Sequence, residues 1–265
     1  MNYKRKADYI LDILFPRKCV CCNEIIDDEE ELCDNCLRFI ERVDASKRCP
    51  ACGLEKKSCQ CKMYAYHFDS MVSPFYYEGI ARKGFYNFKF NGKEHYGIFF
   101  AREMARTVIS ELDIKNFDAI CYVPMSYKSR LIRLYNQSYV LAKHISELTN
   151  IPLIEHSLKR RFSLKYQHTK SREKRFKGVR KIFLFNKEKT HLLKNKRILL
   201  VDDVKTTGAT LDECSRQLLF GGAKSVSCVT ALITDQIKRE RRISPVLTQK
   251  RADKLLSDFG ANIKP

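Results

Sequence analysis

The pattern of apolar and polar positions changes character near residue 62. Beyond that point, short apolar runs that fit β-strands alternate with stretches in which apolar residues recur every three or four positions, as in helices. Asn91 and Gly92 break the first helical stretch, and Gly221 and Gly222 end the last. Alternating strands and helices predict a parallel sheet covered by helices. The predicted strands are 68–77, 117–124, 180–185, 196–203 and 225–234, and the predicted helices are 78–112, 136–150 and 211–219.

Composition sets limits on the class of protein. The 265 residues are enough for one α/β domain with a small accessory module, and an apolar content of 44% argues against general disorder. The net charge of +19 indicates a partner with phosphate groups, on nucleic acid, on a metabolite or at a membrane surface. A generally lysine-rich proteome explains the same charge without a ligand.

The start of the chain, MNYKRKADYILDILF, carries a basic head and a short apolar part. Asp12 interrupts that part, which is too short for a signal peptide or a membrane span. The pattern predicts a short amphipathic helix and no transmembrane segment. We therefore expect a cytoplasmic protein, with a peripheral position at the inner face of the membrane as an alternative.

Nine of the twelve cysteines lie between Cys19 and Cys61. A reducing compartment does not sustain structural disulfides, so metal binding is the better explanation. Paired Cys-x2-Cys or Cys-x-Cys turns can supply a tetrahedral, closed and therefore structural zinc shell, which leaves Cys21 spare. One zinc ion with a degenerate second half, and crossed pairing between the halves, stay open as alternatives. The predicted ligands of two Zn²⁺ ions are Cys19, Cys22, Cys33 and Cys36, and Cys49, Cys52, Cys59 and Cys61.

The run ILLVDDVKTTGATL places two acids and a Thr-Gly loop between a strand and a helix. Ligands of α/β sheets bind at the carboxyl ends of strands. Gly208 allows the backbone to approach a ligand, and amides near a helix start favour an anion. Asp202 and Asp203 suit sugar hydroxyls or a magnesium ion. These residues predict a cradle for a phosphorylated ribose, whereas a capping box of Thr210 and Glu213 would only start the helix.

The same run resembles the phosphoribosyl pyrophosphate (PRPP) loop of type I phosphoribosyltransferases. The resemblance implies that Asp202 and Asp203, the candidate catalytic residues, hold the ribose 2- and 3-hydroxyls, and that Mg²⁺ binds together with PRPP. A pyrophosphate loop is implied after an earlier strand. The implied 5-phosphate loop comprises Thr206, Thr207, Gly208, Ala209 and Thr210, and the candidates for the pyrophosphate loop are Met125, Ser126, Lys128, Arg130 and Arg133.

Cysteine turns ahead of such a domain resemble the ComF family of bacterial competence proteins, in which a double zinc ribbon precedes a phosphoribosyltransferase-like domain. The resemblance runs from LFPRKCVCC through VPMS…YNQS to VDDVKTTGAT. Leu134 stands where the family usually has glycine, and Gly178 where asparagine is common, while Gln167 and Arg175 fit the family's flap. The implied organisation is an N-terminal helix and double zinc ribbon (1–62), a type I phosphoribosyltransferase-like parallel sheet flanked by helices (63–235) and a charged C-terminal tail (236–265).

The resemblance implies a role in uptake and processing of single-stranded DNA during natural transformation, beside a helicase or translocation machine at the membrane. Residues 159–181 support contact with DNA independently, because they carry eleven Lys or Arg and one acid, Glu173. A solvated loop, or a flap over pyrophosphate, explains the same charges. The alternative functions are an active phosphoribosyltransferase of nucleotide metabolism or salvage and a non-catalytic PRPP sensor that binds DNA. The flap and DNA candidates are Lys165, Lys170, Arg172, Lys174, Arg175 and Lys177.

A second basic stretch, ARKGFYNFKFNGKEHY, interleaves aromatic residues with lysines. Exposed rings beside lysines can stack unpaired bases, with ~1 to 3 kcal/mol for each base. The spacing of Phe85, Phe88 and Phe99 instead predicts one apolar helical face in the core. The stretch can therefore bind bases only through rings that lie outside this face.

Overall fold

The computed structural model describes residues 16–27, 30–59, 61, 64–90, 93–133, 135–161 and 178–235. Several predicted features lie outside these ranges: the N-terminal helix, Leu134, the C-terminal tail and most of the basic flap, including Lys165, Gln167, Lys170, Arg172, Lys174, Arg175 and Lys177. Across the described ranges, no helix combines the length and the apolar character needed to cross a membrane.

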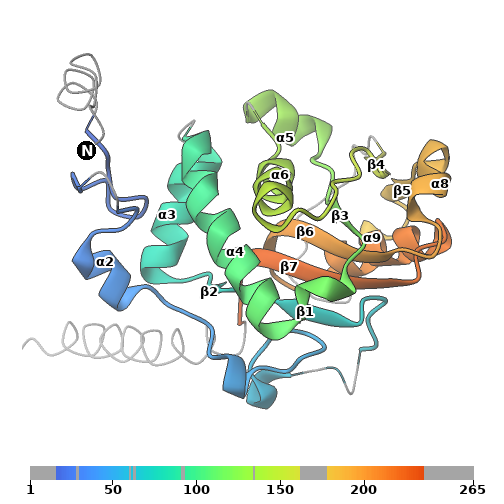
Figure 1. Ribbon diagram of the computed structural model, residues 1–265, viewed down its shortest axis with the longest axis horizontal. Helices are drawn as coiled ribbons and strands as arrows, with labels where there is room; N and C mark the ends of the chain where they lie inside the picture. The colour runs from blue at the N-terminus through green and yellow to red at the C-terminus, as the bar shows by residue number, and fades with distance from the viewer. Residues whose placement is uncertain are drawn as a thin grey trace, which may run out of the picture.

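A parallel β-sheet forms the centre of the described chain (Figure 1). The strand order is β1-β7-β6-β3, and β2 also pairs with β7. In the middle of the sheet, Leu200 of β6 lies between Cys121 of β3 and Cys228 of β7. The predicted fold class is confirmed, although the predicted strand 68–77 is split into β1 and β2. The strands of this sheet are β1 (Ser70–Val72), β2 (Phe75–Tyr76), β3 (Ala119–Tyr122), β6 (Arg197–Lys205) and β7 (Ser225–Ile233).

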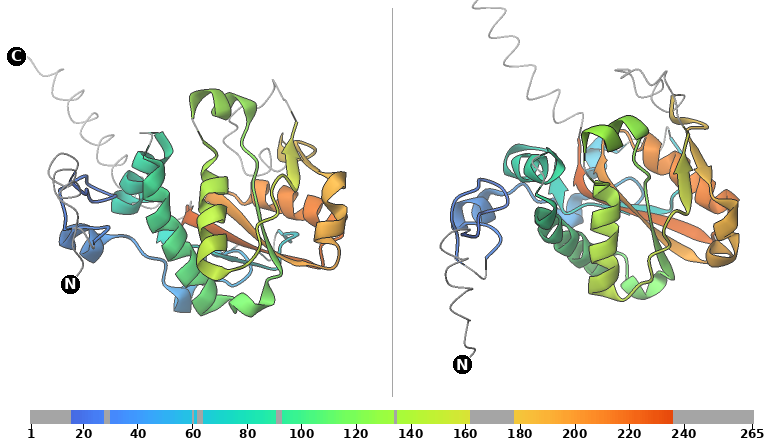
Figure 2. Two further views of the ribbon diagram at one scale, coloured as in Figure 1. Left: turned by 45° about the horizontal axis from the view of Figure 1, so that its top comes forward. Right: turned by 90° about the horizontal axis from the view of Figure 1, so that it is seen from above.

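Helices cover both faces of the sheet. The central strand β6 carries apolar side chains on both faces, and each face must be shielded from water. The helices α3, α4 and α6 lie on one face and α9 on the other (Figure 2). Leu199 and Val201 join the core on the first face, and Ile198 and Leu200 join the core on the second. This alternation is what a buried parallel strand requires. The longer helices are α3 (Gly79–Phe90), α4 (Gly97–Glu111), α6 (Gln137–Thr149) and α9 (Ala209–Phe220), and the short ones are α2 (Asp34–Phe39), α5 (Tyr127–Ile132) and α8 (Thr190–Leu193).

The predicted strand 180–185 does not join the parallel sheet. Its centre forms β5 (Phe183–Phe185), which pairs antiparallel with β4 (Leu158–Arg160) in a separate two-stranded sheet. Antiparallel neighbours, unlike parallel strands, need no crossover connection. The basic flap connects these two strands, and β4 and β5 therefore form its base.

The two cysteine-rich halves pack against different cores. The first half lies beside α3 (Figure 1). There the side-chain amide of Asn87 donates to the backbone oxygens of Val20 and Cys21 at 3.2 and 3.4 Å. The second half contributes Cys52 and Leu54 to the core beneath α9. The zinc ribbon thus shares its apolar contacts with the sheet domain instead of forming a core of its own.

Candidate functional site

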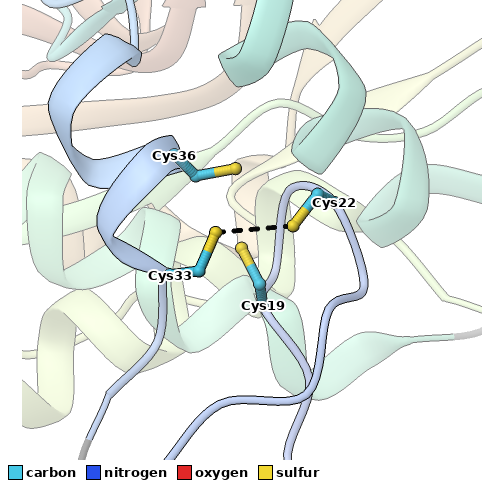
Figure 3. A group of neighbouring side chains, drawn as sticks. All are labelled: Cys19, Cys22, Cys33 and Cys36. Carbon is cyan, nitrogen blue, oxygen red and sulfur yellow. Dashed lines mark hydrogen bonds between the residues drawn. The ribbon is translucent and has the colours of Figure 1, made fainter.

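Eight cysteines form two groups of four in the described chain. Within each group the ligand atoms all lie within 4.8 Å of one another, and in the first group the sulfurs of Cys22 and Cys33 are 3.6 Å apart (Figure 3). The pairing is sequential: Cys19, Cys22, Cys33 and Cys36 form one group, and Cys49, Cys52, Cys59 and Cys61 the other. Both groups fit structural zinc sites of the closed four-sulfur kind.

Cys21 stays outside the first group. Its sulfur packs against α3, where a Cβ added to Gly84 would lie 2.7 Å from it. Burial, followed by the nearby thiols of Cys19 and Cys22, raises the pKa of Cys21 to about 12. A thiol that stays protonated in an apolar contact is a small core residue, so Cys21 helps to hold the first zinc half on α3.

Asp202 and Asp203 lie within the last part of β6. The sequence predicted that the strand ends there, but β6 continues to Lys205 because Val204 and Lys205 pair with β7. Asp202 is 7% exposed, and its Oδ1 atom accepts hydrogen bonds from Ser138 Oγ at 2.9 Å and from the Asp203 N–H at 2.8 Å. Burial, and then the charge of Asp203, raises the pKa of Asp202 to about 7. The acid pair therefore combines a buried carboxyl with a more accessible carboxylate.

A short loop after β6 contains Thr206, Thr207 and Gly208, and α9 begins at Ala209. Gly208 adopts a φ of 85°, in the left-handed region that favours glycine. The first turn of a helix leaves backbone N–H groups without intrahelical acceptors, which favours an anion. Although Thr206 is exposed and Thr207 is buried, both stand at this helix start.

The capping-box interpretation of this loop is wrong. Gly208 occupies the N-cap position without a side-chain hydrogen bond, and Thr210 lies inside the helix. The carboxylate of Glu213 instead binds the Lys181 backbone N–H at 3.2 Å and the Arg216 guanidinium at 2.6 Å. Since the left-handed Gly208 turns the chain into α9, no threonine cap is needed, and Thr210 is left to line the pocket.

One pocket joins the acid pair to the predicted pyrophosphate loop. Asp202, Asp203 and Thr210 line it together with Met125, Ser126 and Arg133 from the chain after β3. This predicted loop is partly helical, since it forms α5, and Arg130 of α5 is exposed and does not line the pocket. The side chain of Lys128 lies outside the described structure. Two predicted loops, about 70 residues apart in the sequence, thus share one cavity.

Three further residues at this site were missed by the sequence analysis. Ser138 binds Asp202 from α6, Arg160 lines the pocket from β4, and Lys89 forms an ion pair with Asp203 from α3. The YNQS run carried a local signal for Ser138, because Asn136 Oδ1 accepts the Ser138 N–H at 3.1 Å and starts α6. Lys89 and Arg160 lie in the two basic stretches of the sequence, but nothing local placed them at the acid pair, because only the tertiary fold brings them to β6.

The segment after the second zinc group lies against α9. The backbone N–H of His67 donates to Asp212 Oδ1 at 2.7 Å, and its ring Nδ1 lies 2.9 Å from the same oxygen. Tyr66 stacks on Phe68 with ring centroids 4.6 Å apart, and its ring lies beside Gly208. The second zinc half is therefore connected to the start of α9 by only a few residues.

Family models match two parts of the chain. Residues 10–66 match a double zinc ribbon domain, and residues 136–263 match a phosphoribosyl transferase domain. Among solved structures, the purine phosphoribosyltransferase from Pyrococcus horikoshii Ot3 is similar at 18% identity, with a TM-score of 0.32 over 52% of this chain and 84% of that chain.

Curated relatives carry competence names. Competence protein ComFC of Bacillus subtilis is 25% identical over 219 residues, which cover 78% of this chain and 86% of that protein. Competence protein ComFC of Streptococcus pneumoniae is 27% identical over 207 residues, with 76% and 86% covered. Competence protein F of Haemophilus influenzae is 31% identical over 109 residues, with 41% and 47% covered. The order of the two matched domains, together with similarity to ComFC along most of the length, shows that this chain belongs to the ComF family of competence proteins.

Proposed function

We propose that the chain binds PRPP, or a related phosphoribosyl ligand, at the end of β6 and acts on single-stranded DNA that enters the cell during natural transformation. The observation that carries the ligand assignment is the shared pocket, where Asp202, Asp203, Thr210 and Arg133 converge. The competence names of the relatives support the DNA role. The proposal keeps the division into a zinc ribbon (1–62), a phosphoribosyltransferase-like domain (63–235) and a tail (236–265).

Each part of the pocket suits one part of PRPP. The carboxyl groups of Asp202 and Asp203 accept hydrogen bonds from the ribose 2- and 3-hydroxyls. The loop 206–210 holds the 5-phosphate at the helix start, where backbone N–H groups and the helix dipole favour an anion. The guanidinium of Arg133 provides a fixed positive charge for the pyrophosphate.

The carboxylate oxygens of Asp202 and Asp203 are suitable ligands for Mg²⁺. Mg²⁺ in phosphate sites usually takes one or two carboxylates together with ligand phosphates and water. Among the described residues, the two cysteine sets are the only groups of three or more side chains placed to bind one metal ion. At β6 the described protein side chains therefore supply fewer than three metal ligands. Asp202 and Asp203 would hold Mg²⁺ jointly with PRPP, and the ion would supply charge neutralisation at the pyrophosphate.

Two exposed rings support contact with single-stranded DNA. Phe85, Phe88 and Phe99 are buried as predicted, although Phe99 belongs to α4 and the other two to α3, so they do not form one face of a single helix. Tyr86 and Phe90 are 56% and 48% exposed, and their ring centroids lie 4.8 Å apart. The Arg133 guanidinium lies 4.9 Å from the Phe90 ring centroid and also lines the pocket. Paired rings beside an arginine suit a stacked base and a phosphate, at the rim of the proposed PRPP site.

The same proposal places the protein in the cytoplasm, at the inner face of the membrane, in contact with the DNA-uptake helicase or translocation machinery. The first zinc half offers exposed apolar side chains for such a partner. Ile25, Leu37 and Phe39, all in the first cysteine-rich half, have side chains that are 65%, 51% and 59% exposed. Apolar side chains exposed in this way suit a protein–protein contact.

The decisive experiment measures PRPP binding and turnover in the zinc-loaded chain. PRPP with Mg²⁺ is expected to raise the melting temperature, and the Asp202→Asn, Asp203→Asn double variant is expected to lose that shift. An equal shift in the double variant would exclude the acid pair as the ribose site. Pyrophosphate release from PRPP, assayed against a panel of bases with and without single-stranded DNA, then separates a phosphoribosyltransferase from a PRPP sensor.

A further inference from the structure

Lys89 lies at the junction of three elements of the proposed site. It belongs to the last turn of α3, and its ammonium group forms an ion pair with Asp203 Oδ2 at the end of β6. Its backbone oxygen accepts a hydrogen bond from Gln137 Nε2 at 3.3 Å, at the start of α6. The side chains of Lys89 and Asp203 are only 18% and 19% exposed. One residue therefore connects the acid pair to the end of the predicted pyrophosphate loop.

The helix that carries Lys89 is fixed in place. Phe85 and Phe88 of α3 are fully buried, and the hydroxyl of Tyr135 donates to the Phe88 backbone oxygen. The Lys89 ammonium also lies 5.8 Å from the Phe85 ring centroid, within the range of a cation–π contact. These contacts hold the ammonium beside Asp203 before any ligand arrives.

The negative charges of PRPP and of the acid pair explain why a cation beside Asp203 is useful. PRPP carries a 5-phosphate and a pyrophosphate, and both are repelled by a pair of adjacent carboxylates in a partly shielded pocket. An ionised carboxylate offers about four acceptor positions. On Asp203, Lys89 uses Oδ2, and the Val204 N–H uses Oδ1 at 2.6 Å. Positions for ribose hydroxyls are left on Asp203 while its charge is balanced.

We propose that Lys89 is a positioning residue and the built-in counter-cation of the acid pair. It orients Asp203 toward the ribose hydroxyls and supplies part of the charge neutralisation that a divalent cation otherwise provides. The inference rests on the proposed function, because it concerns a phosphoribosyl ligand at the same site. It implies that PRPP binding in this chain has a reduced requirement for Mg²⁺.

The test is a titration of PRPP into the full zinc-loaded chain, followed by calorimetry over a series of Mg²⁺ concentrations that includes none. Mg²⁺ is omitted from the buffer instead of being chelated, because a chelator would also remove structural zinc. Lys89→Met removes the charge but keeps the methylene chain, and Lys89→Arg keeps the charge. Lys83→Met is the matched control, since Lys83 is an exposed lysine on the same helix.

The expected result is weak but measurable binding by the wild type without Mg²⁺, and none by Lys89→Met. The Mg²⁺ concentration for half-maximal affinity should rise about tenfold or more in Lys89→Met, while Lys89→Arg and Lys83→Met follow the wild type. The same Mg²⁺ dependence in Lys89→Met, or tighter binding, would overturn the proposal. If thermal unfolding shows Lys89→Met to be unfolded, Lys89→Gln gives the same comparison. Failure of the wild type to bind PRPP at saturating Mg²⁺ would instead contradict the proposed function.

Discussion

The hydroxyl of Tyr66 donates a hydrogen bond to the backbone oxygen of Thr207, at a distance of 3.3 Å. Tyr66 lies five positions after Cys61, the last cysteine of the second zinc group. Thr207 belongs to the proposed 5-phosphate loop. The ring of the same tyrosine lies against Gly208, where an added Cβ would be 3.0 Å from Tyr66 Cε1. The segment that directly follows the zinc ribbon thus supports the loop through one aromatic side chain.

Substitution of Tyr66 should separate the hydrogen bond from the ring contact. Tyr66→Phe removes one neutral hydrogen bond, so the free energy of unfolding should fall by about 0.5 to 1.5 kcal/mol. Tyr66→Ala also removes the ring, and PRPP affinity should then fall about tenfold because the loop loses its support. Urea unfolding and calorimetry with PRPP measure the two effects. Phe220→Ala removes an exposed ring at the C-terminal end of α9, and an equal PRPP loss in that control would argue against a specific role for Tyr66.

Loss of zinc from the second cysteine group should weaken the 5-phosphate loop more than loss of zinc from the first group. Metal analysis of gently purified protein should find about two zinc ions for each chain, one in each cysteine group. Cys59→Ser and Cys33→Ser should each lose about one ion. PRPP affinity should fall more in Cys59→Ser, because only the second group is connected closely to Tyr66 and the loop. A larger fall in Cys33→Ser would contradict the proposed path from zinc to phosphate.

Asp202 should make both stability and binding depend on pH. Its pKa is raised to about 7 by burial and by the charge of Asp203, so between pH about 4 and about 7 the folded state holds a proton that the unfolded state has released. The stability linked to this proton is present below that range and is lost as the pH rises through about 7. Relative to the wild type, Asp202→Asn should therefore become more stable as the pH rises from about 5 to about 8.

PRPP binding should have the opposite dependence on pH. The ionised form of Asp202 is the better acceptor for ribose hydroxyls, so PRPP affinity should rise as the pH passes through about 7. Calorimetry at several pH values tests this expectation, after correction for ionisation of the phosphates measured on free PRPP. A wild-type profile that matches the Asp202→Asn profile would show that Asp202 does not titrate in this range.

Local patterns predicted the parts of the site whose chemistry lies in continuous runs of sequence. The cysteine turns and the acid pair each span only a few residues, and the structure places them in two cysteine groups and one pocket, whereas Thr210 is the member of the predicted 5-phosphate loop that lines this pocket. The strand and helix periodicity likewise predicted the parallel sheet. These features depend on local spacing, which a single sequence displays directly.

Contacts that depend on the tertiary fold could not be predicted in this way. Lys89 reaches Asp203 over 114 residues and Tyr66 reaches Thr207 over 141. The strand at Phe183–Phe185 had the apolar character of a sheet strand, yet it pairs with β4 in a separate antiparallel ribbon and not with the parallel sheet. The capping box failed because T-x-x-E describes two side chains, whereas the backbone conformation of Gly208 decides how α9 begins.

Gly208→Ala should damage the loop through the backbone. At a φ of 85°, a side chain beyond glycine is strained, and the new Cβ would also press on Tyr66. The free energy of unfolding should fall by about 1 to 2 kcal/mol, and PRPP affinity should fall with it. Gly178→Ala is a suitable control, because a Cβ at Gly178 meets no atom within 4 Å. Equal stability of the two variants in urea would mean that Gly208 adopts another conformation in solution.

The ring pair at the pocket rim gives the sharpest test of DNA binding. Tyr86 and Phe90 are both exposed, so replacing them with alanine should leave the core intact while removing a stacking surface of ~1 to 3 kcal/mol for each base. Fluorescence anisotropy with a labelled single-stranded oligonucleotide should show affinity at least about fivefold lower in the double variant, with an unchanged slope against salt, because no phosphate contact is lost. Phe220→Ala is the control, since Phe220 is 78% exposed on α9, which covers the other face of the sheet. If the double variant and the control bind the oligonucleotide equally well, the bases are stacked elsewhere; a flatter salt slope would instead mean that the substitutions disturb Arg133, which lies over Phe90.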